Sequence, residues 1–294
     1  MASLLDHYSL EMTAKDGQAL EAASECITAG TEISITFLPG EDRDARIAAA
    51  QTVKRTGMIP LPHISARRVP TSEELDVFVE KLVRQAGVDR VFVVAGDSGK
   101  PEGPYEDSLA VIRSGRLARH GIRKVGIAGY PEGHPDIPQA RLWAALKEKQ
   151  STLAALGHSC EIVSQFSFDA QVILQWLERV RDEGIIAPVK VGIPGPASVK
   201  SLLRFAARCG VSVSTKVMGK YGLSLAKLLS SAGPDALIEE LEANLNPSLH
   251  GAVKLHLYTF SGLARTAQWA YEYRASHRSR PVSASVESFD SSGG

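Results

Sequence analysis

The segment GYPEGHPD, residues 129–136, places a tyrosine, a histidine and two carboxylates among prolines and glycines, directly after the apolar run KVGIA. A plain turn needs glycine and proline but rarely an aromatic, a carboxylate and an imidazole together, so Tyr130, Glu132 and His134 are candidate site residues. Polar residues also occur near the ends of other apolar runs: Glu11, Thr36, His63, Asp97, Gln165, His256 and Tyr258. If those runs are parallel strands, their polar ends meet at one rim.

Glu11 is the candidate for proton transfer. It lies in the short run YSLEM, residues 8–12, with Leu10 and Met12 on the opposite side of a strand. On an edge strand this carboxylate would simply face water, whereas in the first strand of a closed barrel it faces a cavity or is desolvated. Burial raises the pKa of a carboxyl group, so such a glutamate can deliver a proton at neutral pH.

The other candidates have structural alternatives that the residues leave open. Asp97 is also typical of a turn cap, His63 of a hydrogen-bonded packing residue, and Gln165 of a side chain that satisfies nearby backbone groups. The sequence has no HExxH, CxxC or GxSxG motif, which disfavours a metal site or a covalent nucleophile. Aromatic, amide and carboxylate groups at one mouth suit a planar, hydrogen-bond-rich ligand such as a pterin or a flavin.

The elements that must position these residues follow a regular alternation. Eight β-rich runs are separated by amphipathic stretches, the count of a (β/α)8 TIM barrel. The runs cover residues 8–12, 32–38, 58–65, 90–96, 124–130, 160–166, 188–194 and 254–260. An open doubly wound sheet is the alternative, but its nucleotide-binding form would carry a GxGxxG turn after the first strand. Residues 211–250 hold extra helical material, KYGLSLAKLLSSAG and PDALIEELEANLN, before the last strand.

The composition is ordinary for a soluble globular protein, and the length permits either one large domain or two smaller ones. Among 294 residues, 33 Lys and Arg balance 33 Asp and Glu, so no net field favours nucleic acid or a membrane surface. No apolar run is long enough to span a membrane, and Cys26, Cys160 and Cys209 are far apart, as expected of small core residues in a reducing cytoplasm. We expect a barrel over residues 1–276 and a disordered tail over 277–294, and a homo-oligomer is compatible with the sequence.

Six short motifs, in one order, resemble those of the methylenetetrahydrofolate reductase family. The block AGYPEGHPD is similar to the family's strand-five signature, and the others are SLEM, LPHISAR, VAGD, SQFSFD and LHLYTF. The resemblance extends over roughly residues 8–275. A single such motif is weak, whereas six at the ends of barrel strands are specific.

The resemblance implies a reaction and a role for each matching residue. Glu11 would be the general acid that opens the five-membered ring of 5,10-methylenetetrahydrofolate, and a hydride passed from NAD(P)H through FAD would give 5-methyltetrahydrofolate. Asp97 would be the second catalytic residue, which contacts the pterin and tunes the reaction, and Gln165 with Phe166 would bind the folate. The residues implied at FAD are Thr36, His63, Gly96, Asp97, Tyr130, His134 and Lys149. The family's partners are tetrahydrofolate derivatives, and the physiological direction is not encoded.

The chain departs from the family pattern around the flavin. Ala95 stands where relatives commonly have an arginine before Gly-Asp, and Glu148 interrupts Lys147 and Lys149 in LKEKQ. Each lost cation near a pyrophosphate should cost roughly 1–3 kcal/mol of charge-assisted hydrogen bonding, so we expect weakened FAD binding. This motivates an alternative, a barrel that binds methyltetrahydrofolate without redox chemistry and serves a methyltransferase pathway. A different flavin barrel, similar to proline dehydrogenase, has less support.

Overall fold

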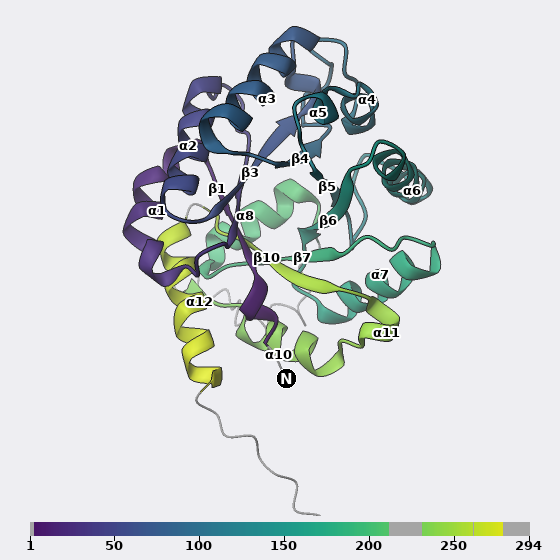
Figure 1. Cartoon of the computed structure of the whole chain (residues 1–294). Coiled ribbons are helices and arrows are strands. Elements are labelled where there is room, and N and C mark those ends of the chain that lie inside the picture. Colours follow the sequence, from purple (N-terminus) through teal and green to yellow (C-terminus); the bar gives the residue numbers. More distant parts are fainter. Residues whose placement is uncertain (1–2, 212–230, 261, 279–294) are drawn as a thin grey trace, which may run out of the picture.

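The chain forms a closed barrel of eight parallel strands, which confirms the predicted fold (Figure 1). The computed structural model describes residues 3–211, 231–260 and 262–278. The barrel strands are β1 (Ser9–Met12), β2 (Glu32–Ile35), β3 (Ile59–Ser65), β4 (Arg90–Val94), β5 (Lys124–Gly129), β6 (Ser159–Phe166), β7 (Val189–Pro194) and β10 (Val253–Tyr258). β1 pairs with β2 on one side and with β10 on the other, so the barrel has no free edge and Glu11 is not on an edge strand.

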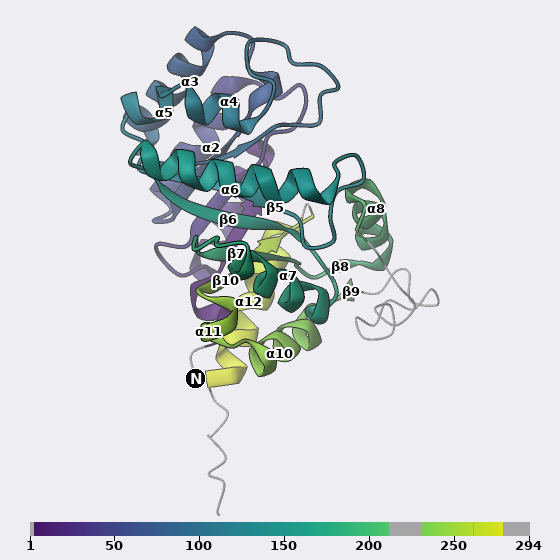
Figure 2. The same cartoon turned by 90° about the vertical axis from the view of Figure 1, so that its right-hand side faces the viewer.

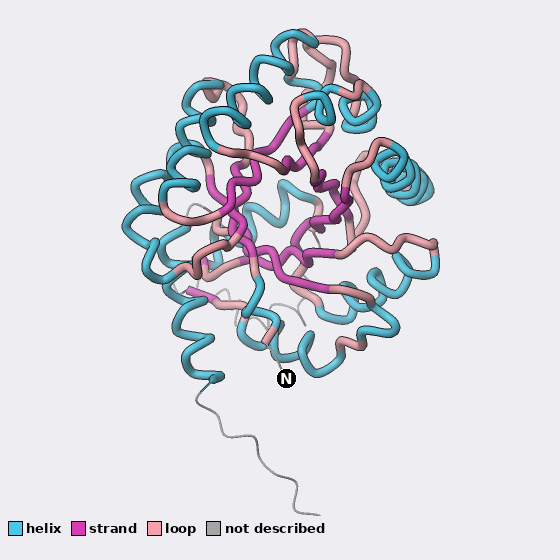
Figure 3. Tube along the Cα trace, in the orientation of Figure 1, coloured by secondary structure: helices cyan, strands magenta, loops and turns pink. Residues whose placement is uncertain are grey.

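Helices surround the strands (Figure 3). They are α1 (Gly17–Ala23), α2 (Arg43–Arg55), α3 (Ser72–Ala86), α4 (Ser108–Arg113), α5 (Arg116–Arg119), α6 (Gln139–Ala155), α7 (Ala170–Asp182), α8 (Val199–Cys209), α10 (Asp235–Asn244), α11 (Pro247–His250) and α12 (Leu263–Arg278). α3 illustrates why they form. The Thr71 hydroxyl caps its first turn by accepting from the Glu74 N–H, Gly87 ends it in the left-handed conformation, and its apolar side is buried on the barrel wall.

The extra material before the last strand is partly as predicted. The segment PDALIEELEANLN contains α10, which contacts α7. The segment KYGLSLAKLLSSAG lies mostly outside the described residues, and its helical prediction is wrong at residues 231–232. These form β9 (Ser231–Ala232), which pairs antiparallel with β8 (Ala197–Ser198), because the chain here returns beside the loop that follows β7.

The ends of the chain bear on the predicted domain boundary. α12 continues to Arg278, two residues past the expected limit of the barrel at 276. Residues 279–294 lie outside the described residues, so the disordered tail stays a prediction. Within the part of the chain that the structure describes, no helix has the length and apolar character needed to cross a bilayer.

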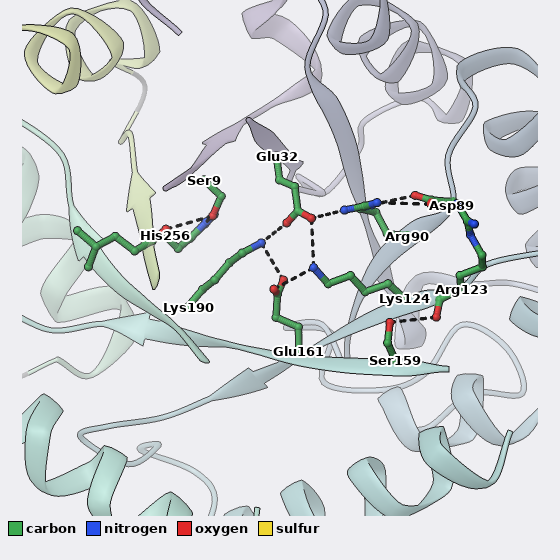
Figure 4. A network of polar contacts seen from close by, with 11 residues as sticks. Ser9, Glu32, Asp89, Arg90, Arg123, Lys124, Ser159, Glu161, Lys190 and His256 are labelled. Atoms are coloured by element: carbon green, nitrogen blue, oxygen red, sulfur yellow. Dashed lines mark hydrogen bonds and ion pairs between the residues drawn. The ribbon is translucent and has the colours of Figure 1, made fainter. Parts of the chain in front are cut away.

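Charged side chains fill the end of the barrel at which the strands begin (Figure 4). Lys190 of β7 contacts Glu32 of β2 and lies 2.7 Å from Glu161 of β6, and β2 and β7 are not neighbours, so the contact crosses the interior. Lys124 bridges the same two carboxylates at 3.2 and 2.9 Å, and Arg90 also pairs with Glu32. Burial alone would raise the pKa of Glu32, but Lys190, Lys124 and Arg90 outweigh it and lower that pKa to about 2. We call these five residues the ionic layer.

Next to the ionic layer, the barrel interior holds both polar and apolar side chains. His256 is 2% exposed, and its Nδ1 lies 2.8 Å from the Ser9 hydroxyl. It therefore lies below the mouth rather than at the rim where the sequence placed it. An apolar cluster shares the barrel interior and separates the ionic layer from the open end: Leu61, Phe92 and Val163.

Candidate active site

Glu11 occupies the end of the barrel at which the strands finish. It is the third residue of β1, level with Ser34 of β2, and is half-buried. Burial raises the pKa of Glu11 to about 7, with a smaller contribution from the charge of Asp16. Among the described residues, no side chain or backbone group hydrogen-bonds to its carboxylate. Glu11 is thus a carboxyl group close to half-protonated at neutral pH, with its oxygens available to a ligand.

Three further strands and one helix bring polar groups to Glu11. Tyr258 of β10 and Cys209 at the end of α8 both interact electrostatically with the Glu11 carboxylate. The Cys209 thiol also hydrogen-bonds to the Gln165 side chain and interacts with Tyr130. The structure therefore gathers Glu11, Tyr130 and Gln165 around one mouth, as predicted, and adds Cys209, which the sequence suggested only as a core residue.

Aromatic rings and a backbone contact hold two of these strands in register. The Tyr258 hydroxyl donates to the Ser164 carbonyl at 3.0 Å, and Gln165 Oε1 accepts from the Phe166 N–H at 3.2 Å. Phe166 is only 1% exposed and packs edge-on against Tyr258 and Phe260 at 5.5 and 5.2 Å between ring centroids. Phe166 therefore packs among aromatic rings beneath the mouth, and its contact with folate stays a prediction.

α8 lies beyond the end of the barrel at which α6 begins (Figure 2). Ser198 caps its start by accepting from the Ser201 N–H at 3.2 Å, and Gly210 ends it at φ 67. Phe205 stacks on Phe260, with ring centroids 4.5 Å apart. A Cβ added to Gly210 would lie 3.0 Å from Cδ of Pro135. The last turn of α8 therefore fits closely against the GYPEGHPD loop and carries Cys209 to the mouth.

Asp97 lies on the outer rim of the same mouth. Its side chain is 63% exposed and stands 3.8 Å from both Arg68 and Arg208. Gly96 before it adopts φ 88, where a Cβ would lie 3.3 Å from Cβ of Ser65, so glycine allows β4 to turn outward here. Arg208 and Cys209 are adjacent in α8, so one helix end contacts both Asp97 and the group around Glu11.

Hydrogen bonds and a ring contact hold the GYPEGHPD loop together. Gly133, at φ 83, donates to the Tyr130 carbonyl at 3.1 Å, and His134 Nδ1 accepts from the Asp136 N–H at 3.1 Å. The Tyr130 and His134 rings meet edge to face at 5.3 Å. Glu132 accepts from the Ser167 hydroxyl at 2.7 Å, which ties the loop to the end of β6.

Thr36 and His63 lie at the ends of β2 and β3. His63 is 8% exposed, and its Nε2 lies 2.7 Å from the Ser34 hydroxyl. Burial, with the nearby Arg46 charge, lowers the pKa of His63 to about 3, so the ring is neutral and does not act as an acid at neutral pH. Thr36 follows β2, and its N–H donates to the Met12 carbonyl at 2.8 Å. Both residues are therefore suited to hydrogen bonding or packing rather than to proton transfer.

The basic residues of LKEKQ do not join this mouth. Lys149 lies against the barrel wall, where burial lowers its pKa and its charged neighbour is Asp107. Lys147 pairs with Glu183 at 2.7 Å, and Glu148 pairs with Arg113. The Lys149 contact with FAD stays a prediction. No cluster of three or more potential metal ligands occurs in the described ranges.

A closed parallel barrel with a buried glutamate of raised pKa, an amide and tyrosines at its carboxyl-end mouth has the arrangement typical of a ligand-binding (β/α)8 barrel. A family model for methylenetetrahydrofolate reductase matches residues 13–268, and the chain belongs to that family. The match begins two residues after Glu11.

Named relatives are distant and longer. The chain is 27% identical over 217 residues to methylenetetrahydrofolate reductase (NADH) 1 of Arabidopsis thaliana, a match that covers 68% of this chain and 35% of the relative. It is 26% identical over 188 residues to 5,10-methylenetetrahydrofolate reductase of Pectobacterium carotovorum, covering 62% and 59%. The chain thus spans between about one third and three fifths of the length of these relatives.

A solved structure is similar across nearly the whole chain. It is an uncharacterised protein from Clostridium thermocellum that binds two copies of 5-methyl-5,6,7,8-tetrahydrofolic acid, and it aligns with a TM-score of 0.58 over 93% of this chain and 98% of its own. The identity is 12%, so the likeness establishes the shared fold.

Proposed function

We propose that this protein is a folate-dependent oxidoreductase that interconverts 5,10-methylenetetrahydrofolate and 5-methyltetrahydrofolate, with Glu11 as the general acid and base. The observation that carries the proposal is the Glu11 carboxyl group, which has no hydrogen-bond partner among the described residues and a pKa raised to about 7. Family membership supplies the substrate class. Gln165 and the Tyr258 ring beside Glu11 suit the polar edge and the flat face of a pterin.

Glu11 would act on the nitrogen side of the substrate. In the reducing direction its proton passes to the folate nitrogen that leaves the methylene carbon, the five-membered ring opens, and the carbon becomes electrophilic. A hydride that originates from NAD(P)H then completes the methyl group. In the oxidising direction the Glu11 carboxylate takes the proton back, because a catalyst uses the same path both ways.

The family implies FAD as a cofactor. The residues near the mouth fit its flavin ring but not its phosphates. Thr36, His63, Tyr130 and His134 could hold a flavin ring, which when bound would relay the hydride from the nicotinamide. The phosphate end fits poorly, because Ala95 replaces the usual arginine and the lysines of LKEKQ are engaged elsewhere. The proposal therefore assigns chemistry only to the chain's own proton-transfer and binding groups.

The Glu11→Gln variant tests the acid–base role. We expect turnover to fall by about 10² or more, the scale of a lost general acid, while the dissociation constant for 5-methyltetrahydrofolate changes little. Turnover is measured with the folate and an electron donor or acceptor, and binding by calorimetry. Glu25→Gln, a surface change of the same kind, is the control. Unchanged turnover in Glu11→Gln would remove Glu11 from the mechanism.

A second candidate is a barrel that binds methyltetrahydrofolate for a partner methyltransferase, without redox chemistry. The poor fit of this chain's residues to the phosphates of FAD favours this candidate. An absorbance spectrum of the purified protein, before and after added FAD, followed by titration with 5-methyltetrahydrofolate, separates the two. A colourless protein that takes up no FAD and still binds the folate favours the second candidate. Flavin uptake with turnover favours the first.

A further inference from the structure

A buried pair of a hydroxyl and an imidazole lies beside Glu11. Ser34 of β2 is level with Glu11 of β1, and its hydroxyl lies 2.7 Å from Nε2 of His63. Ser34 is 2% exposed and His63 is 8% exposed. On β3, Leu61 pairs with Ser34 in register, and His63 is two residues closer to the carboxyl end of the strand. Because side chains two residues apart point the same way, His63 points into the barrel, as Leu61 does, but nearer the mouth.

Three contacts fix the position of His63. Its backbone carbonyl accepts from the Arg46 guanidinium, its ring packs against Phe92 with 4.7 Å between ring centroids, and its Nε2 contacts the Ser34 hydroxyl. The other ring nitrogen, Nδ1, has no hydrogen-bond partner in the described ranges, and it is not fully buried. Nδ1 is therefore the ring atom left to a ligand in the mouth.

The Ser34 hydroxyl determines which nitrogen of His63 carries the proton. The ring is neutral, since burial and the Arg46 charge lower the pKa of His63 to about 3, and a neutral imidazole has one N–H and one acceptor nitrogen. Within the described part of the chain, the Ser34 hydroxyl has no acceptor other than Nε2. A buried hydroxyl hydrogen without an acceptor is costlier than an unused lone pair. Ser34 therefore donates to Nε2, and the ring proton lies on Nδ1.

A second pair of the same kind lies deeper in the barrel and lacks this constraint. The Ser9 hydroxyl lies 2.8 Å from Nδ1 of His256 and 3.4 Å from the Leu255 carbonyl. Its hydrogen has two possible acceptors, so either form of His256 is compatible with the contacts. The two pairs are alike in chemistry and burial, but His256 lies below the mouth. Ser9 is therefore a matched control for Ser34.

We infer that Ser34 is a positioning residue, whose hydroxyl fixes the Nδ1–H form of His63 so that His63 donates a hydrogen bond to a ring carbonyl or ring nitrogen of a planar ligand in the mouth. Flavin and pterin rings both carry such acceptors. A neutral donor suits them, because it binds an uncharged acceptor without the desolvation cost of an imidazolium. The ligand part of this inference rests on the proposed function, whereas the protonation of His63 does not depend on it.

¹⁵N NMR of the whole, ligand-free chain with labelled histidine tests the protonation directly, because protonated and unprotonated ring nitrogens differ in chemical shift. The His63 signals are assigned by their loss in His63→Leu. We expect the proton on Nδ1 in the unmodified chain and in Ser9→Ala. In Ser34→Ala the Nε2–H form should appear, since no hydroxyl then constrains the ring. A His63 proton on Nε2 in the unmodified chain would overturn the inference, whether or not any variant folds.

Titrations with FAD and, separately, with 5-methyltetrahydrofolate test the ligand part by calorimetry. We expect Ser34→Ala to weaken binding of at least one of them by about three- to tenfold, the scale of one hydrogen bond, and Ser9→Ala to leave both affinities unchanged. The two variants should lose similar Tm, because each removes one buried hydroxyl. In the His63→Leu background Ser34→Ala should have no further effect on affinity, because Ser34 acts through His63.

The outcomes separate this inference from the proposed function. If the unmodified chain binds neither ligand, the proposed function and the ligand part both fail, while the NMR result still decides the role of Ser34. If a ligand binds but Ser34→Ala and Ser9→Ala change its affinity equally, the role of Ser34 is structural and the inference is overturned. The same conclusion follows if Ser34→Ala weakens binding as much in His63→Leu as in the unmodified chain.

Discussion

At the scale of single residues, the protonation state of Glu11 should determine how the rates of reduction and of oxidation depend on pH. The raised pKa of about 7 means that Glu11 is protonated below neutral pH and ionised above it. Because reduction of the methylene carbon consumes this proton, its rate should fall as the pH rises through about 7. Oxidation of the methyl group needs the carboxylate, so its rate should fall as the pH drops through the same value. Initial rates in both directions across the neutral range measure the effect.

Glu11 should also make the stability of the folded protein depend on pH. A carboxyl whose folded pKa exceeds its unfolded value costs stability as the pH rises from the unfolded value, ordinarily 4.5, to about 7. Glu11→Gln removes that cost, so its Tm relative to the unmodified chain should be higher at pH 8 than at pH 5. Parallel rate profiles in the two directions, or a Tm difference that does not vary with pH, would contradict the assignment of this pKa to Glu11.

At the scale of elements, α8 is the helix that completes the mouth. Its last turn packs on Pro135 and carries Cys209 to Glu11 and Gln165. Gly210→Ala should disturb this contact, because the added methyl would lie 3.0 Å from the Pro135 ring and the residue has φ 67. We expect binding of 5-methyltetrahydrofolate, measured by calorimetry, to weaken several-fold.

Gly157→Ala is the matched control for that change. Gly157 follows α6 at φ 78 and a Cβ there would meet nothing within 4 Å, so the substitution carries the backbone cost, about 1 kcal/mol, without touching the mouth. Both variants should therefore lose similar Tm, and only Gly210→Ala should lose folate affinity. Equal losses of affinity would mean that α8 affects the mouth only through general stability.

At the scale of the whole molecule, the ionic layer and the mouth occupy opposite ends of the barrel and should be separable. Lys190→Met leaves Glu32 and Glu161 facing each other with less compensation, and removing one partner of a buried ion pair costs roughly 3–5 kcal/mol. We expect that loss in urea unfolding, and unchanged folate affinity at a temperature where the variant is folded. Lys254→Met, on the exposed side of β10 near the same end, is the control and should change stability little.

The layer also predicts the acid limit of the fold. The lowered pKa of Glu32 contributes stability that is complete above its unfolded value and is lost as the pH falls toward about 2. The pH at which acid unfolding begins should therefore lie below the ordinary range of carboxyl titration. This pH should be higher in Glu32→Gln. If Lys190→Met weakens folate binding as strongly as it lowers stability, the two ends of the barrel are not independent.

Much of the frame could be read from local patterns. Short β-rich runs between amphipathic stretches predicted the eight strands. The alternation of side chains along a strand placed Glu11 opposite Leu10 and Met12. The composition of GYPEGHPD predicted a rigid, polar loop, since its glycines and prolines restrict the backbone wherever it lies. Strand ends were less certain: the run expected over 32–38 forms a strand only over Glu32–Ile35, followed by one further hydrogen bond from the Thr36 N–H to the Met12 carbonyl of β1.

Other features had no local signal. Lys190, Glu161 and Glu32 each resemble an exposed charge at the start of a strand, and only barrel closure places them in contact. Cys209 has the pattern of a core residue in an amphipathic helix, and Lys149 that of a basic residue available to a phosphate. Only the path of α8 over the mouth brings Cys209 to Glu11, and only the position of α6 places Lys149 beside Asp107.

The sequence by itself determined the barrel, the family, and the carboxylate that faces the interior, because these depend on periodicity and on short motifs whose spacing survives in one dimension. The tertiary structure alone decided the raised pKa of Glu11, the position of Cys209 and the contacts of the ionic layer. Each of these depends on solvent exclusion and on distances between residues that are remote in the chain, and neither quantity exists until the strands close.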